Sequence, residues 1–271
     1  MIGRARIIQL ASAAIAACAL LASAPALAQS VKIGVLNDQS GVYADFGGKW
    51  SVEAAKMAIE DFGGSVLGQN IELVTADHQN KPDLASAIAR RWYEAEGVDM
   101  ITDINNSSVA LAVQQIAAEK NKIDIVVGSS TPALTGSACV PYGFQWAFDT
   151  HGLAVSTGGA LVKTGADTWF FITVDYAFGH ALEKDTSDVI AASGGKVIGH
   201  VLYPLNTPDF SSFLLQAQTS KAKIVALANA GQDAINSVKQ AAEFGIVAGG
   251  QRVAALLLTA AFGIGDSPVD Y

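Results

Sequence analysis

Between residues 31 and 258, short apolar runs alternate with longer segments whose apolar residues recur at helical spacing. The pattern predicts strands at Val31–Asn37, Ile71–Asp77, Val98–Ile104, Ile123–Gly128, Thr168–Val174, Lys196–Tyr203, Lys223–Asn229 and Val253–Leu258. It predicts helices at Trp50–Phe62, Asp83–Ala95, Ser107–Lys120, His151–Lys163, Phe178–Ala192, Asp209–Thr219 and Asp233–Phe244. Strands that alternate with helices are typical of βαβ units. The expected fold class is therefore α/β, with parallel sheets flanked by helices.

The second predicted helix carries a clear start signal and a clear buried face. Asp83 follows Pro82 and is expected to be the N-cap. The apolar stripe that a helix needs in order to cover a sheet is formed by residues that recur at helical spacing, namely Leu84, Ile88, Trp92 and Ala95. Glycines also stand after several predicted helices, where they favour termination.

The alternation breaks between Thr131 and Thr150, a stretch that contains Pro132, Pro141 and Gly143. We interpret this break as the passage between two Rossmann-like lobes. Lobe one would span residues 29–147 and lobe two residues 148–258, with four strands in each. Residues 259–271 would form an atypical tail.

The first 28 residues predict a cleavable secretory signal peptide. Arg4 and Arg6 give a positive start, and an Ala/Leu/Ile-rich run follows. Residues 26–28 (Ala-Leu-Ala) form a small-x-small signal-peptidase cleavage site. A membrane anchor is an alternative, although serines and a proline interrupt the run. A lipid anchor on Cys18 is another, because residues 15–18 resemble a bacterial lipobox. The expected location is the periplasm.

Composition argues against several functions. Removal of the first 28 residues changes the formal net charge from −8 to −10, and no run of Lys or Arg is present, so nucleic acid is not an expected partner. Cys139 is then the only cysteine, which makes an intramolecular disulfide impossible, and we interpret it as a buried apolar side chain. A hydrophobic content of 51% suffices for one large or two modest cores.

The residues that directly follow the strands are the candidate site, because ligands bind beyond the carboxyl ends of strands in open α/β sheets. These residues are 37–41, 105–108 and 129–131 in lobe one, and 175–179 and 229–233 in lobe two. They are rich in hydroxyl, amide and aromatic groups, which orient a ligand through hydrogen bonds. None is a nucleophile beside a base, which argues against an enzyme.

Ser107 and Ser108 begin a predicted helix, where unpaired backbone N–H groups and the helix dipole favour an anion. A ligand carboxylate fits this position. The alternative is that Asn106 or Ser107 only caps the helix.

Aromatic and acidic side chains in the same loops suggest further contacts. Four aromatic residues could enclose an apolar ligand body or belong to the core: Tyr43, Phe46, Tyr176 and Phe178. Asp175 or Asp233 could hold a ligand ammonium, or could act as acids at the starts of helices.

Motifs for other chemistry are missing from the sequence. It contains no phosphate-binding loop of the Gly-x-x-x-x-Gly-Lys type, no Gly-x-Gly-x-x-Gly, no Gly-x-Ser-x-Gly and no His-Glu-x-x-His. The four histidines lack metal-ligand spacing. We therefore expect neither a metal nor a cofactor.

Several segments are informative in combination, namely Val31–Leu36, Ser40–Gly41, Phe46–Gly47, Ser129–Pro132, Asp175–Gly179 and Pro208–Phe210. Together they resemble the leucine/isoleucine/valine-binding family of periplasmic solute-binding proteins. The resemblance implies the type I fold, in which two lobes are joined by a hinge that the chain crosses three times. It also implies that the lobes close on a ligand and present it to an inner-membrane ABC permease.

The resemblance also implies roles for particular residues. In the family pattern, lobe one holds the ligand carboxylate through Asn106 and Ser107 and through Ser129 and Thr131, while Phe46 and Phe178 are aromatic wall positions. The complete predicted ligand-binding set is Phe46, Asn106, Ser107, Ser129, Thr131, Tyr176, Phe178, Asn229, Gln232 and Asp233.

Two departures from the family pattern stand out. Family members generally continue for roughly a hundred residues more, so we expect the C-terminal part to be missing, sheet edges and apolar faces to be exposed, and binding by this chain to be weak or absent. Residues 259–261 (Thr-Ala-Ala) also stand where amino-acid binders carry an acid. This favours a ligand without an ammonium, such as an aromatic acid, beside a branched-chain amino acid.

The leading hypothesis is a monomeric periplasmic component of an ABC importer that binds a small carboxylate-bearing solute. A sensory receptor with the same lobes and a signalling partner is a second hypothesis. An exported enzyme is a third, more distant one, since it would need a nucleophile and a base in the cleft.

Overall fold

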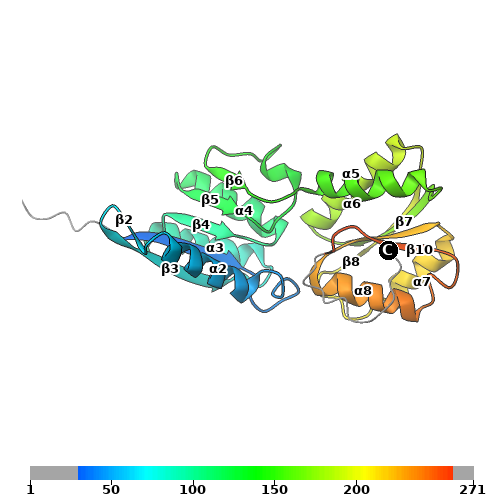
Figure 1. Ribbon diagram of the computed structural model, residues 1–271, viewed down its shortest axis with the longest axis horizontal. Helices are drawn as coiled ribbons and strands as arrows, with labels where there is room; N and C mark the ends of the chain where they lie inside the picture. Colours follow the sequence, from blue (N-terminus) through cyan, green and yellow to red (C-terminus); the bar gives the residue numbers. More distant parts are fainter. Residues whose placement is uncertain (1–29, 259–271) are drawn as a thin grey trace, which may run out of the picture.

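The computed structural model describes residues 30–258, and these form two lobes that lie side by side (Figure 1). The predicted signal peptide and the predicted atypical tail lie outside the described residues. The elements that come first in the chain are β1 (Val31–Asn37), α2 (Gly48–Asp61), β2 (Ser65–Val66), β3 (Gln69–Asp77), α3 (Pro82–Glu94), β4 (Met100–Asp103), α4 (Ser107–Glu119), β5 (Ile123–Val126), the short 3-10 helix η1 (Pro132–Leu134) and β6 (Gly143–Gln145). They are followed by α5 (Thr150–Lys163), β7 (Thr168–Val174), α6 (Ala177–Ala192), β8 (Lys196–Tyr203), α7 (Ser211–Ser220), β9 (Ile224–Ala228), α8 (Gly231–Glu243) and β10 (Arg252–Ala255).

Each lobe is built around its own sheet. The first sheet has the strand order β2-β3-β1-β4-β5-β6 and the second has the order β10-β9-β7-β8. All pairings are parallel except that of β2 with β3. Parallel pairing follows from the helices that connect successive strands. The predicted α/β fold class is therefore confirmed.

Most strand and helix predictions are confirmed, some at the same bounds. Val31–Asn37, Thr168–Val174 and Lys196–Tyr203 are strands as expected. The prediction of four strands in the first sheet is wrong, because β2 and β6 are additional members with only two and three residues. Segments that short carry no detectable hydrophobic period.

Helix α3 shows how the pattern of apolar residues determines packing. Ala85, Ile88, Ala89 and Trp92 are buried on one face, at helical spacing. The Trp92 ring lies against β1 at Gly34, where an added Cβ would come within 2.5 Å of the ring. The prediction that Asp83 is the N-cap is wrong. Lys81 occupies that position and Pro82 is the first helical residue, because proline is pre-organised for the first turn.

The first sheet is covered unevenly by the described part of the chain. Helix α2 lies beside β1 and β3 and lines an apolar groove of about 600 Å³ with residues such as Ile33 and Met100. Further along the same face, Val127, Phe144 and Trp146 are 41%, 50% and 80% exposed. Parallel sheets are ordinarily covered on both faces. The expected exposed apolar face is therefore present within residues 30–258.

Cys139 corrects another expectation. We expected a buried apolar side chain, but the structure places Cys139 on the surface between η1 and β6. The segment around it contains prolines and glycines and forms mostly turns, so it covers little of the core.

Candidate functional site

The loops at the carboxyl ends of the two sheets meet each other. Val42 follows β1, and its carbonyl oxygen accepts a hydrogen bond of 2.9 Å from the Gln232 backbone N–H, which follows β9. The Tyr43 and Tyr176 hydroxyl oxygens are 2.5 Å apart. The loops predicted from the strand ends therefore face one another between the lobes, as the rule for ligand sites in α/β sheets requires.

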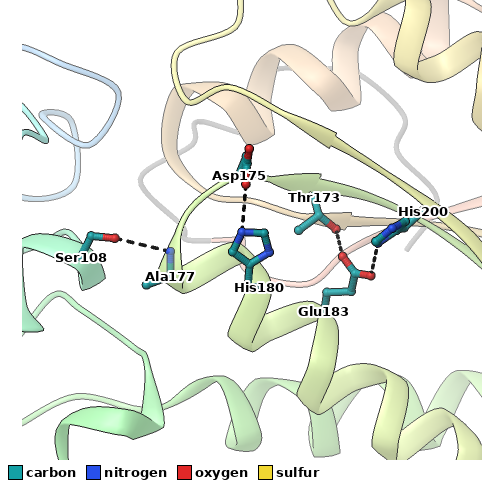
Figure 2. Close-up of polar contacts among 7 residues, drawn as sticks. All are labelled: Ser108, Thr173, Asp175, Ala177, His180, Glu183 and His200. Carbon is teal, nitrogen blue, oxygen red and sulfur yellow. Dashed lines mark hydrogen bonds and ion pairs between the residues drawn. The ribbon is translucent and has the colours of Figure 1, made fainter. Parts of the chain in front are cut away.

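Figure 2 shows a third contact between the lobes, in which the Ala177 backbone N–H at the start of α6 donates to Ser108 Oγ near the start of α4, at 3.4 Å. It joins the first turns of two helices, one from each lobe. A ligand carboxylate near the start of α4 would therefore lie close to lobe two.

Asn106 and Ser107 have different roles at the start of α4. Asn106 is the N-cap, and its Oδ1 accepts from the Val109 N–H at 3.1 Å while its Nδ2 donates to Asn80 at 3.2 Å. The helix-capping alternative therefore holds for Asn106. Ser107 Oγ is buried and has no hydrogen-bond partner among the described residues, and the same is true of Asn105 Nδ2. Buried polar groups ordinarily have a hydrogen-bond partner, which makes these two groups the candidates in this loop for a bond to a ligand.

The backbone before α4 is held in an unusual conformation. Asp103 and Ile104 have φ values of 80° and 52°, in the left-handed region that side chains such as Ile rarely adopt. The Asn37 side-chain amide donates to Asp103 at 2.7 Å and to the Gly48 carbonyl at 2.8 Å. This buried contact supports the sharp turn that leads from β4 into the α4 N-terminus.

Ser129 and Thr131 lie beside that turn. Ser129 Oγ donates to the Ile104 carbonyl at 2.5 Å, so the hydroxyl proton is engaged while the oxygen keeps the capacity to accept. Thr131 Oγ1 accepts from the Ala133 N–H at 3.4 Å and caps η1. Both residues are buried, and the Ser129 bond joins their loop to the one that leads into α4.

The predicted residues after β9 are engaged within lobe two. The Asn229 side-chain amide donates to Ser237 at 3.1 Å, and Gln232 Nε2 donates to Asn236 at 3.0 Å. Asp233 accepts from the Asn206 N–H at 3.0 Å, and burial raises its pKa to about 6. The Asp233 carboxylate thus holds the segment before α7 against α8.

The four aromatic candidates form one chain of contacts across the lobes. The rings of Tyr43 and Phe46 are 5.4 Å apart, and those of Tyr176 and Phe178 are 6.0 Å apart. The Tyr43–Tyr176 hydroxyl pair connects the two halves. Phe178 is only 4% exposed and belongs to the core of lobe two, which was the alternative left open for it.

The second acidic candidate, Asp175, lies on the surface. Figure 2 shows Asp175 paired with His180 at 2.9 Å, and Glu183 between the Thr173 hydroxyl and His200, at 2.6 Å from each. These histidines form isolated pairs.

Within residues 30–258 there is no group of three or more His, Cys, Asp or Glu side chains placed to hold a metal ion. No helix in that range is long and apolar enough to cross a membrane.

Sequence reasoning missed a polar network beneath the lobe-one loops. The buried Asp38 carboxylate accepts from Asn80 Nδ2 at 2.6 Å, and the Asp38 N–H donates to Asn105 Oδ1 at 2.8 Å. His78 is also buried, and burial lowers its pKa to about 4, so that it stays neutral. The signal for Asp38 was present, because an Asp three residues before a Gly favours a side-chain turn. The strand-end rule had already included Asn105, but nothing local indicated Asn80 or His78.

Two α/β lobes with facing strand-end loops define the class of two-lobed ligand-binding proteins. The sequence profile of the family described as periplasmic binding protein matches residues 30–263. The chain therefore belongs to this family.

Known relatives support the same assignment. Leu/Ile/Val-binding protein homolog 6 of Brucella melitensis is 25% identical over 244 residues, which cover 89% of this chain and 62% of the relative. A periplasmic binding protein of Burkholderia mallei has a solved structure with 54% identity and a TM-score of 0.83, covering 85% of this chain and 61% of that one. The chain thus spans about three fifths of the length of these relatives.

Two further solved structures are of proteins with a stated ligand class. A branched chain amino acid ABC transporter periplasmic ligand-binding protein of Burkholderia xenovorans LB400 is 39% identical, with a TM-score of 0.67 and coverage of 83% of this chain and 60% of that one. An ABC transporter solute binding protein of Rhodopseudomonas palustris BisB5, in complex with 3,4-dihydroxy benzoic acid, is 26% identical, with a TM-score of 0.75 and coverage of 83% and 61%. The relatives are solute-binding proteins rather than enzymes.

Proposed function

We propose that this protein is the periplasmic solute-binding component of an ABC importer, and that its two lobes close on a small carboxylate-bearing ligand. The observation that carries the proposal is the start of α4, where the buried Ser107 hydroxyl and the Asn105 amide lack partners among the described residues. A carboxylate accepts hydrogen bonds from such donors and from the first backbone N–H groups of a helix.

The facing loops of lobe two support closure over that position. Ser108 lies one residue further along α4 and already bonds to the start of α6, so a ligand beside Ser107 would have both lobes within reach. Thr131 supplies a neighbouring hydroxyl group, and Phe46 and Tyr176 supply aromatic surface. Concave sites of this mixed kind suit a small organic acid.

Within this proposal we favour aromatic acids over amino acids as the ligand. An amino acid needs an acceptor for its ammonium, and one oxygen of Asp233 is already taken by Asn206. Asp175 is paired with His180 on the surface. Among relatives, the solved protein of Rhodopseudomonas palustris BisB5 holds a dihydroxybenzoate.

Ligand-observed NMR detects weak as well as tight binding, so it suits a first test of the proposed ligands. Benzoate, 4-hydroxybenzoate and leucine would each be tested for saturation transfer from the protein. Signals from the benzoates are expected, and Ser107→Ala should weaken binding by about 10- to 150-fold, the range expected for one lost buried hydrogen bond to a charged group.

The matched control is Thr186→Val, which also removes a buried hydroxyl without a partner among the described residues, but on α6 away from the strand ends. It should leave binding unchanged. Absence of saturation transfer from all three compounds would contradict the proposal. Ligand-dependent stimulation of the ATPase of the cognate permease would test the importer role.

A further inference from the structure

The loop between β1 and α2 belongs to lobe one, but two of its residues are buried in lobe two. Val42 and Tyr43 are 5% and 2% exposed, and both belong to the hydrophobic core cluster that contains Trp169, Phe178 and Leu227. Burial of large apolar and aromatic side chains is the main favourable term in association. The loop therefore contributes to the contact between the lobes as well as to the rim of the site.

Directional contacts fix this insertion. The Gln232 N–H donates to the Val42 carbonyl at 2.9 Å, and the Tyr43 and Tyr176 hydroxyl oxygens are 2.5 Å apart. Burial raises the pKa of both tyrosines, so both hydroxyls are protonated at neutral pH and one can donate to the other.

Lobe two contacts the loop at a position that must be glycine. Gly231 has a φ of 64°, and an added Cβ would lie 2.3 Å from the Val42 carbonyl oxygen and 2.8 Å from the Tyr43 ring. Both distances are below ordinary contact. Gly231 is thus required for the close approach of the lobe-one loop, in addition to its left-handed backbone.

Lobe one shapes the loop before it reaches lobe two. The buried Asp38 carboxylate accepts from the backbone N–H groups of Gly41 at 2.8 Å and Tyr43 at 3.0 Å. The same carboxylate accepts from Asn80 at 2.6 Å. Three donors on one carboxylate hold the turn rigid, so Tyr43 is presented in a fixed position.

We propose that Val42 and Tyr43 form a latch between the lobes. Asp38 in lobe one holds these two residues in position, and Gly231 and Tyr176 in lobe two contact them. The proposal rests on the proposed function, since a latch has meaning only for lobes that open and close. In a latched protein, contacts between the two lobes supply part of the free energy of closure, in addition to the contacts with the ligand. The latch therefore raises both the closed fraction of the ligand-free protein and the apparent affinity.

Distances between spin labels measured by pulsed EPR test the latch without any ligand. The exposed Cys139 labels lobe one, Ser212→Cys labels exposed α7 in lobe two, and Cys18→Ser removes the other cysteine. Tyr176→Phe keeps the ring and removes the hydroxyl bond, and the ratio of short to long distances should fall about fivefold, as expected for one buried hydrogen bond. Gly231→Ala should produce a larger fall, because its methyl group displaces the Val42 carbonyl.

Two controls separate the latch from general destabilisation. Tyr93→Phe removes a tyrosine hydroxyl that bonds to the Ile123 carbonyl at 2.9 Å inside lobe one. Gly194→Ala adds a methyl at a φ of 87° in lobe two, where nothing lies within 4 Å. Both should leave the distances unchanged.

Distances in Tyr176→Phe and Gly231→Ala that match those of the parent would overturn the latch, whatever the ligand-binding result. Changed distances together with no binding of any acid would leave the latch standing and refute the proposed function instead.

Discussion

Replacing Asp124 by Asn is expected to stabilise the protein at pH 8 and to have little effect near pH 4. Asp124 lies on β5, is fully buried, and neither carboxylate oxygen has a hydrogen-bond partner among the described residues. Burial without a partner disfavours the charged form and raises the pKa to about 7, from an ordinary value of 3.8.

The sign and size of the effect follow from that pKa. Between pH 4 and 7 the folded state binds one more proton at Asp124 than the unfolded state, so stability falls as the pH rises through this interval. A pKa raised from 3.8 to about 7 corresponds to a penalty on the order of 4 kcal/mol above pH 7. Asn carries no charge, but its amide also lacks partners, so the expected gain at pH 8 is about 1–3 kcal/mol.

Urea unfolding followed by tryptophan fluorescence would measure this difference, because the buried Trp92 reports on the same lobe. Asp99→Asn is the matched control of opposite sign. Partial burial opposes ionisation of Asp99, but hydrogen bonds from Lys122 and from the Lys32 N–H outweigh it and lower its pKa. That variant should be less stable than the parent at neutral pH, with a difference that closes as the pH falls through the lowered pKa.

The reasoning is refuted if Asp124→Asn is no more stable than the parent at pH 8. It is also refuted if the advantage does not shrink toward pH 4, because a pH-independent gain would come from packing rather than from charge.

Two further substitutions test packing and the site. Gly179→Ala should lower stability by about 3 kcal/mol or more, measured by thermal unfolding, because the new Cβ would lie 2.0 Å from the Val174 carbonyl oxygen; an unchanged melting temperature would contradict this. Thr131→Val should weaken binding of a carboxylate ligand by about 1–3 kcal/mol in NMR titration if its buried hydroxyl bonds to the ligand, and an unchanged affinity would remove Thr131 from the site.

The hydrophobic pattern alone determined the fold class and the order of the main elements. Helix α3 and strands β1, β7 and β8 were predictable because each buries one face or nearly all of its length, and the spacing of apolar residues records that burial directly. The loops of the proposed site were predictable for a similar reason, since in parallel sheets the carboxyl ends of strands share an edge.

Only the tertiary structure decided which polar groups in those loops are already engaged. Asn106 caps α4 and Ser129 bonds to Ile104, whereas Ser107 has no partner among the described residues, yet all three are small polar residues in similar loops. The insertion of Tyr43 beside Tyr176 depends on residues 133 positions apart. Local sequence encodes backbone preference and burial, but the partner of a side chain depends on how distant segments pack, and no short pattern contains that information.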